Sequence, residues 1–309
     1  MLPLKEYYFE LRSLMPVSYS SGKEVDMIYV TGDTHGTVPF GYVSIDGISR
    51  RFNMAGFPEQ KEMTKDDYVI VCGDFGCVWN YDSRYDPGRN AFKDVICFDH
   101  GESKEEKHWL DWLDKKPFTT LFCDGNHENY DRLDNAYEEV DFHGGKAHRI
   151  RNSVFHLERG YVFDIDGVSV FVFGGASSHD IRDGIVRPSE FASEKELKQK
   201  LRKMNDRSMF YRVDHINWWE RELPSEEEMA RGVRELEKRG NKVDYIISHC
   251  GPQHVDSVMG HTDVDRLTLY FDRIAGTVDF SRWFFGHYHE NRQVMSKYIV
   301  LYEQIVRIW

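Results

Sequence analysis

The chain has 309 residues, of which 40% are hydrophobic and 30% are charged, so it can bury a sizeable core in one large domain or two small ones. It has no run of eighteen apolar residues, and we expect no membrane-spanning helix. The formal net charge of −12 argues against a protein whose main task is to bind nucleic acid through its phosphates.

Cellular location and thiol chemistry follow from two further features. The N-terminal residues lack an apolar core followed by a small-residue cleavage site, so we expect a cytoplasmic protein. The five cysteines are odd in number and form no Cys-x-x-Cys pair, which predicts reduced, buried thiols rather than disulfides or a zinc site. The sequence does not specify an oligomeric state.

The first half of the chain predicts an appendage followed by parallel strands. Residues 1–25 are expected to be an N-terminal appendage with a short helix over 4–15, and residues 26–309 to form one domain. Strands are expected at 27–30, 68–72 and 120–123. Apolar residues at helical spacing, Trp109, Leu110 and Leu113, predict a covering helix over 104–115.

The second half of the chain predicts a different arrangement of strands and helices. Strands at 154–157, 161–165 and 168–173 predict an antiparallel meander in a second sheet packed against the first. Residues 176–240 are predicted to be an insertion carrying a partial lid, with a charged helix over 189–203 and a capped helix from 225 to about 239. The remaining strands are expected at 245–248, 283–285 and within 293–306.

Five of the apolar runs end in a small or polar residue followed by Asp, Asn or His. A buried parallel strand ends in this way at the carboxyl edge of a sheet, where ligand sites of α/β folds gather. One such motif alone is weak, because an isolated Asp-x-His is more often a turn aspartate beside a surface histidine. The ordered set is specific: Gly32-Asp33-Thr34-His35-Gly36, Gly73-Asp74, Gly125-Asn126-His127-Glu128, Ser248-His249 and Gly286-His287-Tyr288-His289.

Carboxylates, imidazoles and an amide oxygen suit two divalent ions that clamp a phosphoryl group and activate a water. One ion would be held by Asp33, His35 and His289. The other would be held by Asn126, His249 and His287. Asp74 is expected to bridge the two, because a carboxylate has two oxygens to share. Mn²⁺ is the first candidate, and Fe, Zn, Co and Ni suit the same ligands.

His127 follows Asn126 directly and is therefore expected to point elsewhere, toward the substrate. If protonated, it could stabilise the transferring phosphoryl group or donate a proton to the leaving oxygen. Asp124 and Glu128 are the neighbours that could keep it charged. The alternative is a structural histidine bonded to a loop.

With these motifs, the sequence resembles a calcineurin-like metallophosphoesterase over residues 27–290. The resemblance implies an α/β fold, namely a four-layer αββα sandwich of two mixed β-sheets flanked by helices, with a dinuclear centre at one edge. It also implies metal-dependent hydrolysis of phosphate esters by metal-bound hydroxide, without a covalent enzyme intermediate. The ligand assignment given above is the one that carries over.

The second motif departs from the family pattern. Many members continue it as Gly-Asp-x-x-Asp-Arg-Gly, where the arginine holds phosphate, whereas here the second Asp and the Arg are missing after Asp74. This counts against a protein serine/threonine phosphatase. Arg132, His179 and Arg182 are candidate replacements, although a surface salt bridge explains either arginine equally well. Trp79 could stack on a ring of the substrate or pack in the core.

The resulting prediction is a phosphomonoesterase or phosphodiesterase acting on a small or nucleotide-like substrate. One alternative is a non-catalytic binding module on the same fold, against which the complete set of ligand types counts. The other alternative is a nuclease, against which the acidic balance and the missing basic, aromatic-interleaved strip count. His254 and His261 follow the fourth motif and are candidates to line the pocket.

Overall fold

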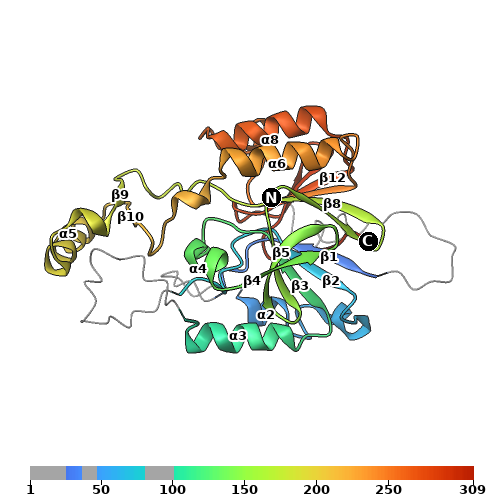
Figure 1. Cartoon of the computed structure of the whole chain (residues 1–309), viewed down its shortest axis with the longest axis horizontal. Coiled ribbons are helices and arrows are strands. Elements are labelled where there is room, and N and C mark those ends of the chain that lie inside the picture. The colour runs from blue at the N-terminus through green and yellow to red at the C-terminus, as the bar shows by residue number, and fades with distance from the viewer. Residues whose placement is uncertain (1–25, 37–46, 81–100) are drawn as a thin grey trace.

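The computed structural model of the chain describes residues 26–36, 47–80 and 101–309 (Figure 1). The predicted appendage, with its helix over 4–15, lies outside the described residues. In the described part, four cysteines are free and buried, namely Cys72, Cys77, Cys123 and Cys250. None of the helices there has both the length and the apolar character needed to cross a membrane.

The larger of two main sheets has seven strands in the order β15-β1-β2-β3-β6-β5-β4. Its central strands β1, β2, β3 and β6 are parallel, and its outer pairs are antiparallel. The strands are β1 (Ile28–Thr31), β2 (Tyr68–Val71), β3 (Thr119–Phe122), β4 (Glu138–Phe142), β5 (Gly145–Arg151), β6 (Val154–Leu157) and β15 (Ile305–Arg307).

The smaller main sheet has six strands in the order β13-β14-β12-β11-β8-β7. Its inner strands β14, β12, β11 and β8 are parallel, and a hairpin partner lies at each edge. The strands are β7 (Tyr161–Ile165), β8 (Val168–Phe173), β11 (Tyr245–Ser248), β12 (Arg282–Phe285), β13 (Arg292–Val294) and β14 (Tyr298–Val300).

The alternation of side chains along each strand builds the layers, because successive residues point to opposite faces. In β1, Ile28 and Val30 join the core between the two sheets, whereas Tyr29 joins the core under the outer helices. In β8, Val170 and Val172 likewise face the other sheet. Both faces of these strands are therefore buried, as their continuous apolar runs predict.

Helices cover the outer face of each sheet (Figure 1). The four-layer αββα sandwich predicted from the sequence is confirmed. The larger sheet is covered by α2 (Ile48–Arg51), α3 (Lys104–Asp114) and the 3₁₀ helix η1 (Pro58–Glu62). The smaller sheet is covered by α6 (Glu226–Glu237), α7 (Gln253–Met259) and α8 (Arg266–Thr277). The short helix α4 (Tyr130–Asn135) follows the third motif.

The chain crosses from the larger sheet to the smaller one between β6 and β7, so the predicted single meander was wrong. The three strands form where expected, but β6 pairs with β3 and β5, whereas β7 and β8 form a hairpin in the other sheet. Gly160, with a φ of 80°, permits the turn in the short connection. Because all four residues of β6 are buried, it belongs inside a sandwich and not at the edge of a separate sheet.

The segment predicted as an insertion with a lid divides into two parts. β9 (Ile185–Val186), α5 (Glu194–Asp206) and β10 (Arg212–Val213) project from one side of the sandwich (Figure 1). This arm has an apolar cluster of its own, formed by Val186, Leu197, Met204 and Val213. In contrast, α6 packs against β7 as part of the outer layer. The lid itself stays a prediction.

A buried ion pair fixes the end of β3 just before the third motif. The Asp124 carboxylate accepts hydrogen bonds from Arg159, His156 and the Tyr130 hydroxyl, and both Asp124 and Arg159 are buried. Burial raises the pKa of Asp124, but the Arg159 charge outweighs it and holds the pKa well below its usual range. The carboxylate is therefore ionised inside the protein and depends on its partner.

Substituting Arg159→Met is expected to destabilise the fold by about 3–5 kcal/mol, because it leaves a buried carboxylate without its cation. The matched control is Arg149→Met, whose ion pair with Glu138 has side chains that are 47% and 69% exposed. That exposed pair is expected to contribute only about 0–1 kcal/mol. Urea unfolding of both variants measures the difference, and equal losses would contradict this assignment.

Candidate metal centre

The five sequence motifs all lie at carboxyl ends of parallel strands, where the edges of the two sheets meet. Asp33 and His35 follow β1, Asp74 follows β2, and Asn126 and His127 follow β3 in the larger sheet. His249 follows β11, and His287 and His289 follow β12 in the smaller sheet. The sandwich thus brings together side chains from distant parts of the sequence at one edge.

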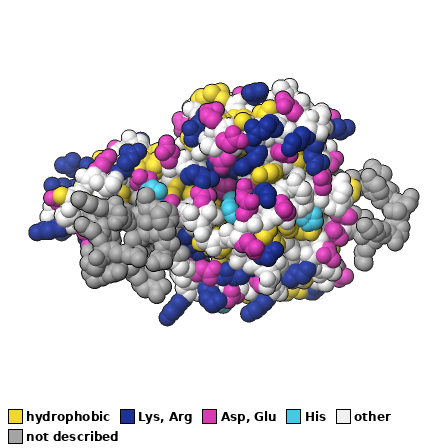
Figure 2. All heavy atoms as spheres, in the orientation of Figure 1, with side chains coloured by type: hydrophobic (Ala, Val, Ile, Leu, Met, Phe, Trp, Pro, Cys, Tyr) yellow, Lys and Arg dark blue, Asp and Glu magenta, His cyan; other side chains and the backbone are white. Residues whose placement is uncertain are grey.

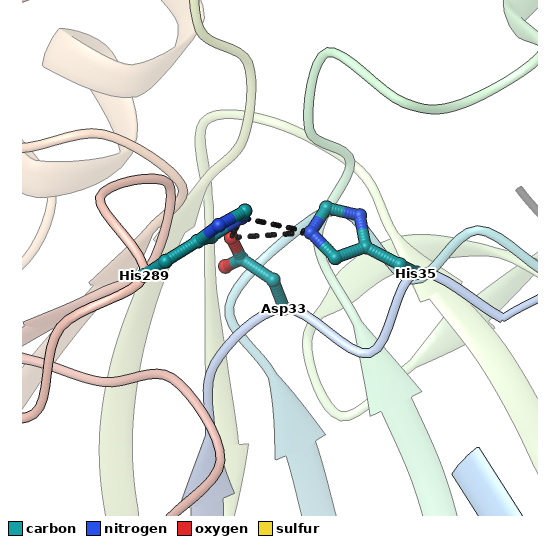
Figure 3. Close-up of side chains that lie close together, drawn as sticks. All are labelled: Asp33, His35 and His289. Atoms are coloured by element: carbon teal, nitrogen blue, oxygen red, sulfur yellow. Dashed lines mark hydrogen bonds and ion pairs between the residues drawn. The ribbon is translucent and has the colours of Figure 1, made fainter. Parts of the chain in front are cut away.

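One group of ligand atoms comes from Asp33, His35 and His289 (Figure 3). The Nε2 atoms of His35 and His289 are 2.9 Å apart, and His289 Nε2 is 3.1 Å from Asp33 Oδ2. His35 Nε2 is 3.8 Å from the same carboxylate oxygen. These three residues are the set that the sequence assigned to the first ion.

A second group comes from Asp33, Asp74 and His249. His249 Nε2 lies 3.2 Å from Asp74 Oδ1 and 3.2 Å from Asn126 Oδ1. On the other side of the ring, Nδ1 donates a hydrogen bond to the Cys72 carbonyl at 2.8 Å. A histidine bonded in this way keeps its other nitrogen available for a metal.

Asp74 lies between the two groups. Its Oδ1 faces His249, and its Oδ2 is 3.7 Å from His35 Nδ1, so its two oxygens reach toward both sides. Asp33 differs from the sequence expectation, since its oxygens take part in both groups and not in one. His287 is close to the second group, with its ring centroid 5.0 Å from that of His249.

Backbone N–H groups hold the two carboxylates in place. The His287 N–H donates to both oxygens of Asp33, at 2.9 and 3.1 Å, and so joins a loop of one sheet to a loop of the other. The His127 N–H donates to Asp74 Oδ1 at 2.8 Å. The orientation of each carboxylate therefore depends on a loop from a different strand.

Four of these residues have a left-handed backbone, which non-glycine residues rarely adopt. The φ angles are 50° at His35, 46° at Asp74, 70° at His287 and 52° at His289. Each such residue costs roughly 1–3 kcal/mol, which the surrounding structure must offset. Strain of this kind gathers at functional sites, where side-chain placement takes precedence over backbone preference.

Glycine at two motif positions makes room for the carboxylates. A Cβ atom added at Gly286 would lie 2.0 Å from Asp33 Oδ1, and one added at Gly125 would lie 2.1 Å from Asp74 Oδ1. Both distances are far below van der Waals contact. The glycines of these motifs are therefore required by close approach of the neighbouring ligand.

The electrostatics of the cluster favour a cation. Burial raises the pKa of Asp33 and Asp74, but the histidines, above all His249 for Asp74, outweigh it and leave both values lowered. Burial lowers the pKa of His249, but Asp74 raises it to about 10, whereas burial lowers that of His287 to about 3. Among the described residues, the two carboxylates have histidine partners and no lysine or arginine.

Buried carboxylates whose charged partners are histidines, with no lysine or arginine, are typical of metal sites, because a buried charge needs compensation. The donor set also fits divalent ions of intermediate hardness, since it combines carboxylate oxygens, imidazole nitrogens and an amide oxygen. On this chemistry, the residues at the sheet edges fit the two-ion arrangement that the motifs predict.

His127 lies beside this cluster, with Nε2 3.9 Å from Asp74 Oδ2. Its expected acidic neighbours have other partners: Asp124 pairs with Arg159, and Glu128 accepts from the N–H groups of Phe75 and Gly76. Burial outweighs the attraction of Asp74 and lowers the pKa of His127 to about 3. The expectation that either of these two neighbours keeps the ring charged is thus corrected.

Comparison with known families identifies the same region. A family model described as calcineurin-like phosphoesterase matches residues 27–291, which contain all five motifs. The chain belongs to the calcineurin-like phosphoesterase family. No curated protein matches the chain. The family assignment agrees with the sandwich fold and with the clustered Asp and His side chains at its edge.

A cavity of about 480 Å³ opens beside the cluster, and Asn126, His127 and His287 line it. Of the four residues predicted to contact substrate, His179 lines the cavity, with its ring 5.7 Å from that of His287. The other three are placed elsewhere.

Arg132 is buried and bound to Glu106 at 2.8 Å, so its guanidinium is part of the interior. Trp79 is also buried, and its ring packs against the rings of His127 and Trp219. Arg182 is exposed and lies over the Phe210 ring, away from the cavity lining. Arg132, Trp79 and Arg182 therefore lie outside the described cavity lining, and their contacts match the alternatives left open for them, packing in the core for Trp79 and other partners for the two arginines.

Sequence reasoning missed Arg212, the one Lys or Arg among the described residues that line the cavity. Its guanidinium is fixed by Asp180, with Nε–Oδ1 at 2.9 Å, and by the Asn217 carbonyl. No motif or spacing marks this arginine, because it reaches the site from the projecting arm. His261, which was a candidate, also lines the cavity, whereas His254 bonds to Asp272 instead.

Substituting Gly286→Ala is expected to displace the Asp33 carboxylate and weaken Mn²⁺ binding by about 10–100-fold, the range found when a metal ligand loses its support. The matched control is Gly276→Ala in α8, where an added Cβ meets no atom within 4 Å. That control should bind Mn²⁺ normally. Calorimetric titration of chelator-stripped protein measures both, and wild-type affinity in Gly286→Ala would contradict the role given to close packing.

Proposed function

We propose that this phosphoesterase is a metal-dependent hydrolase of phosphate esters with a dinuclear centre. The ions would be held by seven residues: Asp33, His35, Asp74, Asn126, His249, His287 and His289. The observation that carries the proposal is the pair of ligand groups sharing buried Asp33 at the edge of a cavity. Mn²⁺ is the preferred ion, with Fe, Zn, Co and Ni as alternatives that the same donors accept.

Two bound divalent ions would polarise the phosphoryl oxygens and lower the pKa of a bound water. The protein's part is to fix the geometry. Asp74 is the proposed bridge: its Oδ1 lies beside His249, its Oδ2 lies 3.7 Å from His35 Nδ1, and the His127 N–H holds the carboxylate in place. The left-handed backbone at four ligand residues keeps their side chains directed to the same point.

His127 is proposed to contact the phosphoryl group and to donate a proton to the leaving oxygen. Its ring lines the cavity beside Asp74, and Trp79 packs against it at a centroid distance of 5.6 Å. Burial lowers the pKa of the ring to about 3 in the protein alone, which disfavours its protonated form. A bound phosphate dianion would raise its pKa, because a nearby negative charge favours the protonated form.

Arg212 is proposed to take the place of the arginine that the second motif lacks. It is the basic residue of the cavity lining, and Asp180 holds its guanidinium in a fixed plane through Nε and Nη2. A guanidinium so oriented suits phosphate oxygens, which it can contact with two parallel N–H groups. Residues 177–180 and Arg212 would then be the part of the predicted lid that contacts the substrate.

The cavity favours a small substrate over a macromolecule. Its volume of about 480 Å³ lies within the roughly 300–1,000 Å³ that small ligands occupy. Acidic and basic side chains are interspersed over the face drawn in Figure 2, which offers no continuous basic strip for a nucleic acid. A small or nucleotide-like ester therefore remains preferred to the nuclease alternative.

The proposal is tested with p-nitrophenyl phosphate and bis-p-nitrophenyl phosphate, using chelator-stripped protein with and without added Mn²⁺. Turnover is expected only with the metal, and Asp74→Asn is expected to lose both bound metal and turnover, because Asp74 is the proposed bridge between the two ions. The preferred compound separates a monoesterase from a diesterase. No turnover with metal bound would indicate a narrow natural substrate, whereas failure both to bind metal and to act on either compound would favour the binding module.

Substituting His127→Ala is expected to reduce turnover by about 10²–10⁴-fold, the usual contribution of a general acid. Metal content should be unchanged, and the loss should be larger for an alkyl phosphate than for p-nitrophenyl phosphate, because a poor leaving group needs the proton more. His254→Ala serves as the control, since that ring bonds to Asp272 outside the cavity lining. Full activity of His127→Ala on the alkyl phosphate would refute the catalytic role.

A further inference from the structure

The arm that carries Arg212 joins the sandwich through a short folded segment. We call residues 212–219 the arm root; they begin with β10 and end at Trp219. The arm root lies beside α4, the short helix that follows the third motif. Because α4 comes directly after the loop of Asn126 and His127, an anchor on this helix would place the arm root relative to the metal centre.

Asp131 in α4 is such an anchor. Its carboxylate accepts a hydrogen bond from the indole N–H of buried Trp219 at 2.8 Å, and its two oxygens lie 2.9 and 3.1 Å from Nδ1 of His215. The Asp131 side chain is only 12% exposed. The hydrogen bond to Asp131 raises the pKa of His215 above its usual range, although burial opposes that shift. One carboxylate therefore binds the arm root at two points, with a charge-assisted bond at His215.

Hydrogen bonds inside the arm root extend this anchoring to Arg212. The Val213 N–H donates to Oδ1 of Asn217 at 2.6 Å, and the His215 N–H donates to the Trp218 carbonyl at 2.9 Å. The Asn217 carbonyl in turn accepts from Nη1 of Arg212 at 2.9 Å. His215 has a φ of 57°, a left-handed conformation that non-glycine residues rarely adopt. The anchored turn thus holds the guanidinium directly through one of its nitrogens.

The remaining contacts of Arg212 leave a defined part of its guanidinium for a ligand. The Asp180 carboxylate contacts Nε and Nη2, whereas Asn217 accepts from Nη1. Each terminal nitrogen of a guanidinium carries a further N–H group, and the side chain lines the cavity. A pair of N–H groups in a fixed orientation suits the oxygens of a phosphate. Their direction depends on where the arm root holds Nη1.

We propose that Asp131 is a positioning residue for phosphate binding, because it fixes the arm root and thereby directs the Arg212 guanidinium into the cavity. This inference rests on the proposed function, which gives Arg212 its contact with phosphate. Asp131 itself lies outside the described cavity lining, so its effect on phosphate requires Arg212.

A different route leads from the same anchor to the proposed general acid. The Trp219 ring packs against Trp79 at a centroid distance of 5.8 Å, and Trp79 packs against His127 at 5.6 Å. This route consists of ring contacts and does not pass through Arg212. Removing the Arg212 guanidinium therefore separates the two routes.

A double-mutant cycle on phosphate affinity tests the inference without any turnover. Inorganic phosphate is titrated calorimetrically into the Mn²⁺-loaded wild type, Asp131→Ala, Arg212→Met and the double variant. Arg212→Met is expected to weaken phosphate binding by about 10–100-fold, which corresponds to the loss of a hydrogen bond to a charged group. Asp131→Ala is expected to weaken it by about tenfold and to have no further effect when Arg212 is already replaced.

A spectroscopic readout reports on the anchor itself in metal-free protein. The indole N–H signal of Trp219, assigned with Trp219→Phe, is expected to move upfield in the nuclear magnetic resonance spectrum of Asp131→Ala, because the N–H loses its acceptor. Asp131→Asn should retain part of the phosphate affinity, since its amide oxygen can still accept a hydrogen bond from Trp219.

Two controls address folding and general charge. Mn²⁺ affinity should be the same in Asp131→Ala as in the wild type, because none of the proposed metal ligands changes. Asp279→Asn should bind phosphate like the wild type, since Asp279 is 70% exposed and pairs with Lys242 away from the cavity lining.

The outcomes separate this inference from the function on which it rests. Wild-type phosphate affinity in Asp131→Ala, or an unchanged Trp219 signal, overturns the positioning role even where p-nitrophenyl phosphate is hydrolysed. A loss of the same size with and without Arg212, or no phosphate binding by the wild type, also overturns it. A loss that requires Arg212 supports the role even if no ester is hydrolysed, in which case only the proposed hydrolase fails.

Discussion

The hydrogen bonds from the His287 N–H to the Asp33 carboxylate are the contact on which the site depends. They join the loop after β1 to the loop after β12 and thereby lock the two sheets together at one edge. Because the carboxylate is buried, its orientation cannot relax into solvent. The left-handed backbone at His287 and the glycine at position 286 allow this close approach to Asp33, whose oxygens take part in both ligand groups.

Most of the sandwich, and the gathering of Asp and His side chains at its edge, could be predicted from the sequence, because strand ends leave local signals. A continuous apolar run followed by Gly and then Asp, Asn or His marks where a buried parallel strand delivers a ligand, as at Asp74 and His249. α8 also left a signal that sequence reasoning passed over: Leu267, Tyr270, Phe271 and Ile274 have helical spacing behind a capping aspartate. The crossover from the larger sheet to the smaller one between β6 and β7 left no such signal in the sequence, since tertiary packing determines which strands pair.

The substrate side of the cavity could not be predicted in the same way. Arg212 lies in an arm strand, where no rule of spacing links it to the motifs. Arg132 and Trp79 are close in sequence to a motif, yet both side chains are buried and bind or pack against other residues outside the cavity lining. The candidate metal ligands come from the strands that end at this edge of the sheets. The other residues that line the cavity come from segments that the fold brings over that edge.

The contact between Asp33 and His287 spans 254 residues, which has a consequence for how the protein matures. During synthesis, β1 emerges early, but its carboxylate meets the partner loop only after nearly the entire chain has left the ribosome. β15 then completes the same sheet by pairing with β1. Closing such long loops is slow relative to helix formation. An ion at the proposed centre would find its full set of ligands only after this closure, and metal acquisition would then be among the last events in the maturation of the protein.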